Sequence, residues 1–340
     1  MIKYIGETEK SYLENAKVGI LLVNLGSPDE ATEEGLRRYL KEFLWDPRVV
    51  EVSRLIWWCA LNFFILRVRP KKSAEIYKQV WTDQGSPLTV ITRSQSDKLN
   101  TLIKNKYGDN VVVDFAMRYG NPSISDVLNR FRQQKVRRLL IVPLYPQYCA
   151  ATSASVMDAV FQELKTWRVM PEIRSIMQYH HMPEYIDALA ESIQEKWDKS
   201  GKSERLLFSF HGIPKRYVDA GDPYYNECQV TAAKVAEKLG LKDNWYLTFQ
   251  SRFGREEYLT PYTDKTLIEW GKSGVKSVEV ICPGFSADCL ETLEEIEVEN
   301  REYFLGNGGE KFEYIQSLND RASHISMLEK LAESNLTGWL

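Results

Sequence analysis

The sequence lacks the features that would place it in several large classes of protein. It has five cysteines and no C-x-x-C pair, which argues against a disulfide framework and against a structural zinc site. The cysteines are Cys59, Cys149, Cys228, Cys282 and Cys289. We therefore expect free thiols, as in a protein of the reducing cytosol.

An excess of charge of one sign is also missing. The 340 residues carry a formal net charge of −3, whereas binding to phosphate backbones needs a basic surface, so we expect no nucleic-acid partner. The first seventeen residues are charged throughout and have no apolar core, so we expect no signal peptide. At about 100–200 residues per domain, the length favours two domains. The composition specifies no oligomeric state.

No hydrophobic run is long enough to cross a bilayer, which takes about 20 residues. The most apolar run, Ile56–Leu66, reads IWWCALNFFIL. Two interpretations of it stay open: a buried helix, or an amphipathic lip that contacts a membrane surface or a flat apolar ligand. Arg67, Arg69, Lys71 and Lys72 follow directly and would suit an anionic partner at the edge of such a lip.

A glycine-rich phosphate loop is absent as well. The GKS within Trp270–Gly274 lacks the glycine that should stand five residues earlier, where the sequence has Thr266. The segment follows a predicted helix and precedes a predicted strand, so we interpret it as a helix C-terminus. No G-x-G-x-x-G opens a helix after a strand, so nucleotide binding has little support.

What the sequence does contain is an alternation of short apolar runs and longer amphipathic stretches, which predicts an α/β fold. The runs are rich in leucine and β-branched residues without polar alternation, as in parallel strands covered on both faces. A helix is predicted over Leu36–Phe43. The predicted strands are Gly19–Gly26, Val111–Tyr119, Arg138–Leu144, Arg205–His211, Trp245–Arg252 and Ser277–Cys282.

Three short motifs recur in the same order in the two halves. LLVNLGSP at Leu21–Pro28 resembles LLFSFHGIP at Leu206–Pro214. MRYG at Met117–Gly120 is paralleled by SRFG at Ser251–Gly254, and LLIVPLYPQYC by VEVICPGFSADC further along. The recurrence indicates an internal duplication, although strand-and-turn patterns also recur by chance in α/β proteins.

We therefore predict two similar Rossmann-like domains, residues 1–165 and 166–340, each a parallel sheet flanked by helices. Ligands bind at the carboxyl ends of strands in open α/β sheets. Two such domains facing each other would form a cleft lined by these turns.

The first motif with residues suited to chemistry is FSFHGIP, which places His211 at the end of a predicted strand. Neutral imidazole binds a metal or accepts a proton near neutral pH, whereas the alternative is a buried, hydrogen-bonded histidine. The adjacent His180 and His181 have no evident ligand partner, and His324 is expected at the surface.

The second motif, CPGFSADCLETLEEIEVENRE, contains Glu291, Glu295 and Glu299. On an α-helix these three would share one face and span about 12 Å. Such a row of hard oxygen ligands, with one histidine, makes a weak site suited to passing a divalent cation on, whereas a closed Cys/His cage would trap it. The alternative is a capping box with Asp288 as N-cap and Glu291 at N3, and a solvated acidic face.

Taken together along the chain, the motifs resemble those of ferrochelatases. They are LLVNLGSP, GSPL, MRYGNPS, PLYPQY, FSFHGIP, GDPYY, FQSRFGREEYLTPYTDKT and PGFSADCLETLEE. The resemblance runs from about residue 17 to 325 and is nearest to the proteobacterial branch. It implies two Rossmann-like domains around a porphyrin cleft, and insertion of Fe²⁺ into protoporphyrin IX to give protohaem and two protons.

The resemblance also implies roles for particular residues. His211 and Glu291 would be the catalytic pair facing each other across the cleft, and with Glu295 and Glu299 they would contact the metal. Arg69, Tyr77 and Ser86 would hold propionates, and the Ile56–Leu66 run would cover the porphyrin. The expected substrate-binding residues are Asn24, Leu25, Arg69, Tyr77, Ser86, Arg118, Tyr119, Tyr258 and Phe285.

Several positions depart from the family pattern. Cys289 stands where many relatives have a second histidine, and Tyr258 replaces a common tryptophan. Leu25 stands where the coproporphyrin-using branch often has tyrosine, which favours protoporphyrin. No four cysteines cluster in the sequence, so we expect no [2Fe–2S] cluster and no cofactor besides the substrate iron.

Two other functions remain in view: a cobalt-inserting tetrapyrrole chelatase of the same fold, and a porphyrin carrier without catalysis. The chain has only four histidines, fewer than we expect of a cobalt chelatase, and a carrier would need neither His211 nor Glu291. We expect a cytoplasmic enzyme, with peripheral contact to the inner membrane through the Ile56–Leu66 run.

Overall fold

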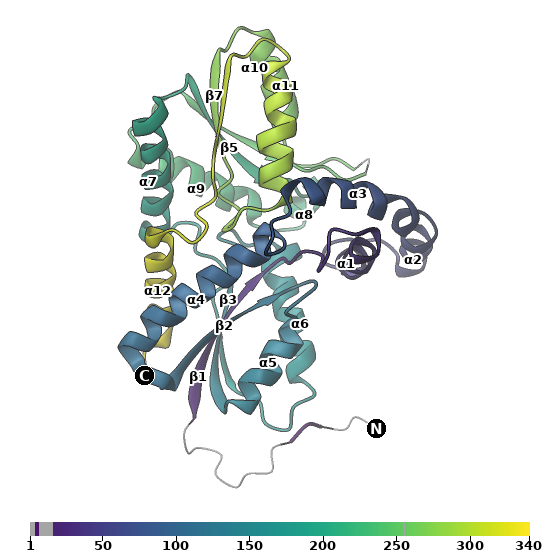
Figure 1. Ribbon diagram of the computed structural model, residues 1–340, viewed down its shortest axis with the longest axis vertical. Helices are drawn as coiled ribbons and strands as arrows, with labels where there is room; N and C mark the ends of the chain where they lie inside the picture. The colour runs from purple at the N-terminus through teal and green to yellow at the C-terminus, as the bar shows by residue number, and fades with distance from the viewer. Residues whose placement is uncertain (1–3, 7–15, 255) are drawn as a thin grey trace. The chain divides into compact units, whose positions relative to one another are not determined.

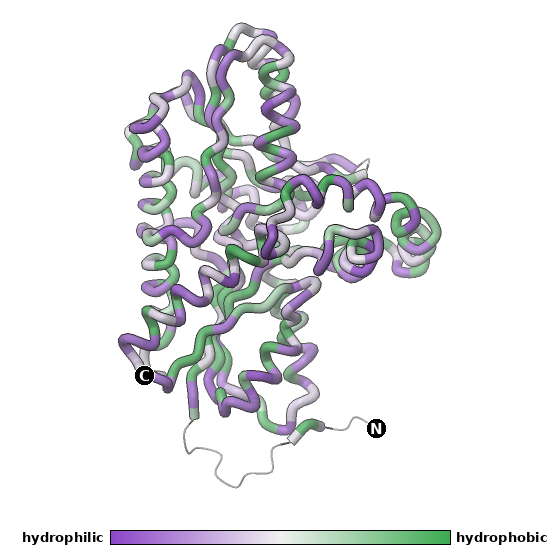
Figure 2. Tube along the Cα trace, in the orientation of Figure 1, coloured by the Kyte–Doolittle hydropathy of each residue, from purple (hydrophilic) through white to green (hydrophobic). Residues whose placement is uncertain are grey.

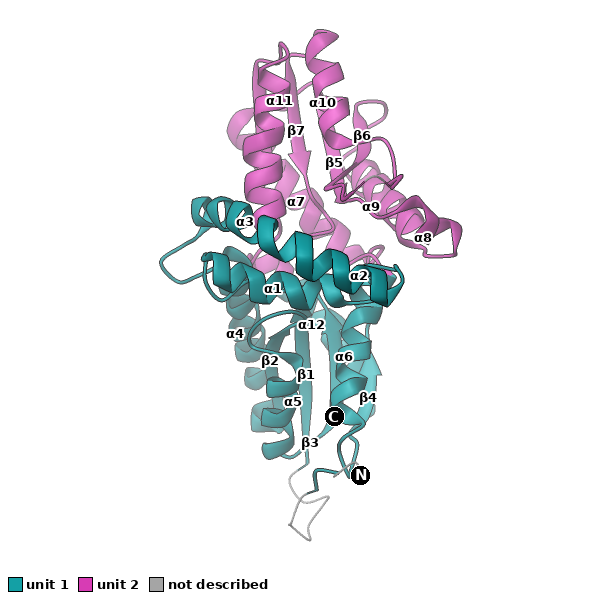
Figure 3. Cartoon of the chain, turned by 90° about the vertical axis from the view of Figure 1, so that its right-hand side faces the viewer, with its two compact units in different colours: residues 1–144, 150–177, 325–340 teal, residues 145–149, 178–324 magenta. Residues whose placement is uncertain are grey.

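The computed structural model describes residues 4–6, 16–254 and 256–340, and the chain divides into two compact units (Figure 3). Unit 1 comprises residues 1–144, 150–177 and 325–340, and unit 2 comprises residues 145–149 and 178–324. A single cut in the sequence, such as the predicted one after residue 165, does not describe this division. The chain instead changes units at several points, and its C-terminal helix returns to unit 1.

Unit 1 is built on a four-stranded parallel sheet of order β2-β1-β3-β4. The strands are β1 (Lys17–Asn24), β2 (Val111–Met117), β3 (Val136–Pro143) and β4 (Glu172–Ser175). β1 is buried from its second residue onward, as its unbroken apolar sequence predicts. Asn24 pairs with Met117, so the turns after β1 and β2 leave the sheet at one edge.

Helices flank the sheet of unit 1 on both sides, with α4 on one side and α5 and α6 on the other (Figure 1). Right-handed crossovers between these strands produce this arrangement. The predicted helix Leu36–Phe43 lies inside α1, where the Thr32 hydroxyl accepts a hydrogen bond from the Gly35 N–H. The helices are α1 (Glu33–Trp45), α2 (Arg54–Ala60), the π-helical η1 (Leu61–Ile65), α3 (Leu66–Val80), α4 (Pro87–Tyr107), the 3₁₀ turn η2 (Gly108–Asn110), α5 (Ile124–Gln133), the π-helical η3 (Ala150–Ala154), α6 (Ser155–Leu164) and, from residue 325 onward, α12 (Ala322–Leu336).

Unit 2 repeats this topology with a four-stranded parallel sheet of order β6-β5-β7-β8. Its strands are β5 (Arg205–His211), β6 (Trp245–Gln250), β7 (Ser277–Ile281) and β8 (Lys311–Ile315). The recurring sequence motifs occupy equivalent places in the two sheets, at the first strand, after the second strand and along the third. The predicted α/β class, with two similar domains that each contain a parallel sheet flanked by helices, is confirmed.

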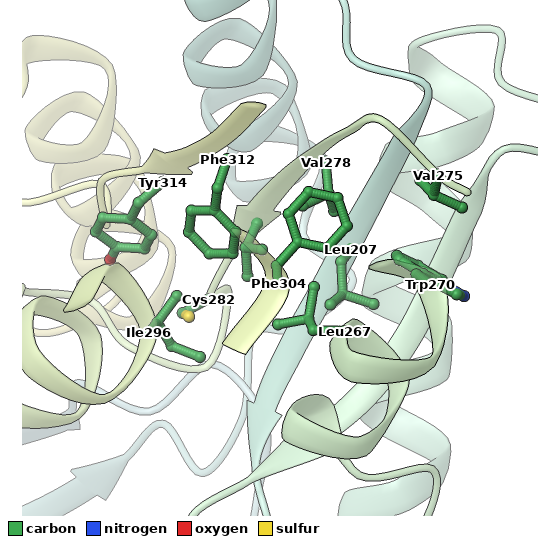
Figure 4. Packing of buried hydrophobic residues seen from close by; sticks show 11 residues of the cluster. Leu207, Leu267, Trp270, Val275, Val278, Cys282, Ile296, Phe304, Phe312 and Tyr314 are labelled. Carbon is green, nitrogen blue, oxygen red and sulfur yellow. The ribbon is translucent and has the colours of Figure 1, made fainter. Parts of the chain in front are cut away.

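Buried hydrophobic side chains fix the helices of unit 2 to its sheet (Figure 4). Ile296 of η4 and Phe304 of α11 pack into the same cluster as Val278 of β7 and Phe312 of β8. The acidic segment around Ile296 is thus anchored to the sheet through its apolar residues. The helices of unit 2 are α7 (Pro183–Ser200), α8 (Lys215–Asp219), α9 (Tyr224–Lys238), α10 (Thr263–Lys272), the π-helical η4 (Glu291–Asn300) and α11 (Arg301–Leu305).

The GKS segment is a helix end, as predicted. α10 stops at Lys272, and Gly274 adopts a φ of 92°. The Val275 N–H donates to the Trp270 carbonyl over 3.0 Å, which satisfies one of the last carbonyls of the helix.

The Ile56–Leu66 run is buried on one side and exposed on the other. Trp57 and Leu61 are buried against unit 1, where they join a cluster with Tyr119. Ile56 and Phe64, in contrast, are 66% and 70% exposed. Hydrophobic residues are concentrated along the strands and again in this α2–η1 segment (Figure 2). Within the described part of the chain, no helix is long and apolar enough to span a membrane.

Candidate active site

His211 is the last residue of β5 and pairs in register with Gln250, the last residue of β6. Its Nδ1 lies 2.8 Å from the carbonyl oxygen of Gly212. A carbonyl can only accept, so Nδ1 carries the proton and Nε2 presents its lone pair. Gly212 is required next to it, because a Cβ there would lie 2.8 Å from the Gln250 carbonyl oxygen.

The surroundings of His211 favour its neutral form. Solvent reaches the side chain, yet the protein around it lowers the pKa of the imidazole by disfavouring the charged state. The negative charge of Glu291 and the Gly212 carbonyl act in the opposite direction. The ring of Phe285 lies 6.4 Å from the imidazole, measured between centroids. His211 therefore offers an unprotonated nitrogen under the electrostatic influence of Glu291.

Glu291 opens η4, whose i→i+5 hydrogen bonds give a wider turn than the α-helix expected from the sequence. The capping-box alternative is wrong, because the Asp288 N–H donates to Asn319 Oδ1 and not to Glu291. The Asp288 carboxylate is occupied by the hydroxyls of Thr292 and Tyr314, among other donors. The Glu291 side chain thus takes no part in capping.

Glu295 is held by three donors at the end of β6. Ser251, at a φ of 62°, donates its N–H to Glu295 Oε1 over 2.8 Å and its hydroxyl to Oε2. Gln250 Nε2 lies 3.4 Å from Oε2. Burial raises the pKa of Glu295 to about 7, although these hydrogen bonds lower it, and the charge of Glu291 adds to the rise. Glu295 therefore keeps its proton to a higher pH than a free glutamate does.

Glu299 lies at the far end of η4 and is exposed. It accepts a hydrogen bond of 2.6 Å from the Tyr303 hydroxyl, and this bond raises the pKa of Tyr303 to about 12. Along η4, Glu291 is thus the first residue, Glu295 is held by hydrogen bonds, and Glu299 is exposed. Within residues 4–6, 16–254 and 256–340, no three His, Cys, Asp or Glu side chains are grouped closely enough to hold a metal ion.

Most of the predicted substrate-binding residues belong to unit 1. Asn24 is buried and donates from Nδ2 to the Thr92 hydroxyl, while its Oδ1 accepts from the Leu25 N–H. Leu25 is half-buried after β1. Tyr77 and Ser86 are buried, the second just before α4, and Arg69 is exposed on α3.

Arg118 and Tyr119 follow β2 and share a buried carboxylate. Asp46 Oδ2 accepts from Arg118 Nη2 at 2.5 Å, from the Tyr119 hydroxyl at 2.9 Å and from the Ser155 hydroxyl at 2.6 Å. The Tyr119 side chain is fully buried, and burial raises the pKa of its phenol far above the ordinary value. Tyr119 therefore helps to hold Asp46, the carboxylate that binds the partly exposed Arg118.

Two expectations about the remaining histidines are wrong. His324 is buried, with Nδ1 2.6 Å from the Asn319 carbonyl, and burial lowers its pKa to about 4. His180 has a partner, because its Nδ1 lies 3.1 Å from Glu227 Oε2. The sequence around each residue gives no apolar pattern that would indicate its burial.

Gln250 and Ser251, which connect the end of β6 to η4, were not identified from the sequence. Gln250 and Ser251 were placed only within the predicted strand Trp245–Arg252, yet both bind Glu295. The available signal was position, since both residues lie near the carboxyl end of the predicted strand Trp245–Arg252, which follows the strand of His211.

A sequence profile of the ferrochelatase family matches residues 17–336. The ferrochelatases of Idiomarina loihiensis and Pseudoalteromonas atlantica are each 54% identical to the chain, covering 99% of it and 93% and 94% of their own lengths. The ferrochelatase of Alcanivorax borkumensis is 52% identical and covers 99% of both chains. The chain belongs to the ferrochelatase family. It is an enzyme of haem biosynthesis that inserts iron into protoporphyrin IX.

Among solved structures, SirB from Bacillus subtilis with Fe³⁺ superposes with a TM-score of 0.56 at 10% identity, covering 94% of this chain and 95% of that one. The sirohydrochlorin chelatase SirB of Bacillus subtilis subspecies spizizenii with cobalt gives a TM-score of 0.53 at 11% identity, with 94% and 95% covered. At this identity the likeness shows the fold alone.

Two departures of this ferrochelatase from its family can now be placed. Cys289 is buried beside Glu291, and burial together with that carboxylate raises the pKa of its thiol well above the ordinary value. A neutral thiol is a poor ligand for iron, so Cys289 does not replace an imidazole in kind. Tyr258 is buried beside Gly212, whose added Cβ would lie 3.3 Å from the Tyr258 ring.

The raised pKa of Glu295 predicts a pH-dependent cost to stability in the metal-free protein. Between pH 4.5 and about 7 the unfolded chain has lost this proton while the folded protein keeps it, so stability falls as pH rises. We expect the free energy of unfolding of wild type to fall by about 3 kcal/mol over this range. The free energy of unfolding of Glu295→Gln should not show this fall, because glutamine does not titrate. Chemical denaturation at pH 4.5 and 8 measures the difference, and a constant difference would contradict the assignment. The exposed Glu302→Gln should show no such trend.

Proposed function

We propose that His211 and Glu291 are the pair that exchanges pyrrole protons for iron in this ferrochelatase. Protoporphyrin IX carries two N–H protons where the metal must sit, so Fe²⁺ enters as both protons leave. The observation that supports the proposal is the neutral His211, with its Nε2 lone pair available, under the electrostatic influence of Glu291. Imidazole and carboxylate can accept one proton each.

The exchange also requires the ring to bend, because in a flat porphyrin the nitrogen lone pairs point at the protons. Binding energy from the large apolar surface of the ring can support this distortion. Phe285, with its ring centroid 6.4 Å from that of His211, is the apolar side chain we assign to this contact in unit 2. Tyr258 next to Gly212 is assigned the same role.

We assign the acidic row to the delivery of Fe²⁺. Glu299 is exposed at one end of η4 and Glu291 lies at the other, so the row connects solvent with the reacting pair. Carboxylates bind Fe²⁺ weakly enough to release it to the porphyrin nitrogens. Glu295 would take up and release protons near neutral pH because its pKa is about 7.

The residues of unit 1 are assigned to the porphyrin. Arg69, with the hydroxyls of Tyr77 and Ser86, would hold propionates through charge-assisted hydrogen bonds. Asn24, Leu25 and the Arg118–Tyr119 pair would contact the ring. We further propose that the enzyme carries no [2Fe–2S] cluster, as the sequence indicates, so that iron is present only as substrate.

We also propose that the enzyme is cytoplasmic and contacts the inner membrane through the exposed side of the α2–η1 segment. Leu55, Ile56 and Phe64 are each at least 66% exposed, and the exposed Arg67 and Arg69 follow them. Apolar side chains edged by cations suit a membrane surface rich in anionic lipid.

The membrane contact is tested by co-sedimentation with vesicles of phosphatidylglycerol and phosphatidylcholine. We expect wild type to sediment with them and the double variant Ile56→Glu/Phe64→Glu to stay in solution. Phe161→Glu, a change at an apolar position on α6 that is 47% exposed, serves as the control. Equal sedimentation of wild type and the double variant would refute the assignment.

Turnover tests the reacting pair. Purified enzyme is assayed anaerobically with protoporphyrin IX and Fe²⁺, Co²⁺ or Zn²⁺, and His211→Ala/Glu291→Gln is compared with wild type. We expect Fe²⁺ insertion in wild type and loss of insertion with porphyrin binding retained in the double variant. Full activity in the double variant would place the chemistry elsewhere, and iron–sulfur absorbance bands in the purified protein would overturn the proposed absence of a cluster.

A further inference from the structure

Gln250 uses all of its hydrogen-bonding capacity to connect the strand of His211 with the segment of Glu291. The side chain is 3% exposed. Its Oε1 accepts from the Ser209 hydroxyl at 2.8 Å and from the Cys282 thiol at 3.4 Å. Its Nε2 donates to the Glu291 carbonyl at 2.9 Å and to Glu295 Oε2 at 3.4 Å.

The Glu291 carbonyl can only accept a hydrogen bond, so it fixes the direction in which this amide points, and a line of buried hydroxyls follows that direction. The hydroxyls of Thr248 and Thr263 are 2.9 Å apart, and those of Thr263 and Ser209 are also 2.9 Å apart. Because Ser209 donates its proton to Gln250, Thr263 must donate to Ser209, and Thr248 must donate to Thr263. The line of hydroxyls therefore supports the orientation in which the Gln250 N–H groups face η4. Aligned hydrogen bonds of this kind also strengthen one another.

We infer that Gln250 is a positioning residue for iron insertion, which holds the first turns of η4, and with them Glu291 and Glu295, at a set place relative to His211. Gln250 and His211 are the last residues of two adjacent strands and pair in register. The hydrogen bonds from the Gln250 amide to η4 therefore set the distance between η4 and His211. The inference rests on the proposed roles of His211 and Glu291. The amide itself is buried among protein groups and acts through its neighbours.

The test compares Gln250→Met, which keeps the size and burial but removes the four hydrogen bonds, with wild type. We expect kcat for Fe²⁺ insertion to fall about tenfold to a hundredfold, because a displaced reacting group costs rate. The KM and dissociation constant for protoporphyrin should be unchanged, since the ring contacts remain. Ser209→Ala, which removes only one of the four hydrogen bonds of the amide, should reduce kcat less, and the double variant should lose no more than Gln250→Met alone.

Gln147→Met is the matched control. Gln147 is another buried glutamine of unit 2, and its Nε2 donates to the Thr231 hydroxyl at 2.9 Å. We expect this variant to lose stability but keep its kcat. If Gln250→Met lowers kcat no more than the control does, or raises the porphyrin KM instead, the inference is wrong.

Glu291→Gln, measured alongside, separates this inference from the proposed function. An inactive Glu291→Gln with a fully active Gln250→Met would overturn only the positioning role. An active Glu291→Gln would overturn the proposed reacting pair itself. If Gln250→Met fails to fold, Ser209→Ala decides, and an unchanged kcat in that variant would count against the inference.

Discussion

Glu291→Gln should lower kcat for Fe²⁺ insertion about a thousandfold, within the range that one positioned acid–base group contributes. Glutamine has the shape of glutamate but is neither a base nor an anion near neutral pH. The η4 segment should be undisturbed, because Gln250 binds the backbone carbonyl of Glu291 and not its side chain. Ile296 continues to anchor the segment in the hydrophobic cluster of unit 2.

Two measurements separate loss of chemistry from loss of structure in this variant. Fluorescence quenching of protoporphyrin should give the same dissociation constant as wild type. Glu297→Gln, on the same segment but paired with Arg301 at 3.6 Å, should retain its kcat. A Glu291→Gln enzyme with at least a tenth of wild-type turnover would exclude Glu291 as a necessary base.

The absence of the Glu291 charge should also change His211. That carboxylate raises the pKa of His211 against the lowering effect of the surrounding protein. With glutamine in its place, the pKa of His211 falls further, so its Nε2 becomes a weaker base. Part of the expected loss of kcat in Glu291→Gln therefore arises at His211. The losses of activity in His211→Ala and Glu291→Gln should consequently add up to more than the loss in the double variant.

The central strands could be predicted because buried strands consist of consecutive apolar residues, which are visible in the sequence. β5 has the predicted bounds Arg205–His211, since five consecutive buried positions leave an unbroken apolar run. The last strand of each sheet along the chain, β4 and β8, was not predicted. β4 spans four residues, none of them buried, and β8 is short and interrupted by charged residues, so neither has the apolar pattern of a central strand.

The site was predictable only in part, for a related reason. His211 and Glu291 occur in distinctive motifs, whereas Gln250 obtains its role from partners that are 41 and 32 residues away in the chain, Ser209 and Cys282. The π-helical form of η4 was also unforeseen, because carboxylates four residues apart suggest an α-helical face equally well. Contacts distant in sequence leave no local pattern.

Asp46→Asn should destabilise the protein by about 3–5 kcal/mol, the usual cost of removing one partner from a buried ion pair. Asp46 and Arg118 have side chains 3% and 17% exposed. The substitution leaves the Arg118 guanidinium without its counter-charge and brings an amide N–H₂ toward the donors Tyr119 and Ser155, where a carboxylate oxygen accepted both hydrogen bonds. Urea denaturation of wild type and variant at pH 7 measures the loss.

A surface pair provides the matched control. Asp158 and Arg48 also form an ion pair, but their side chains are 53% and 37% exposed. Asp158→Asn should therefore cost at most about 1 kcal/mol, because solvent already screens this interaction. Equal losses in the two variants would show that burial does not govern the Asp46 pair.

Acid should reduce the difference in the free energy of unfolding between wild type and Asp46→Asn. Burial alone would raise the pKa of Asp46, but hydrogen bonds from Ser155 and the Arg48 N–H, with the charge of Arg118, hold it below its ordinary 3.8. A depressed carboxyl pKa stabilises the fold above pH 3.8, and this contribution disappears as the pH falls through the lower value in the folded protein. The unfolding curves of the two proteins should converge over that window, whereas a difference that stays constant into strong acid would show that Asp46 acts by packing and not by its charge.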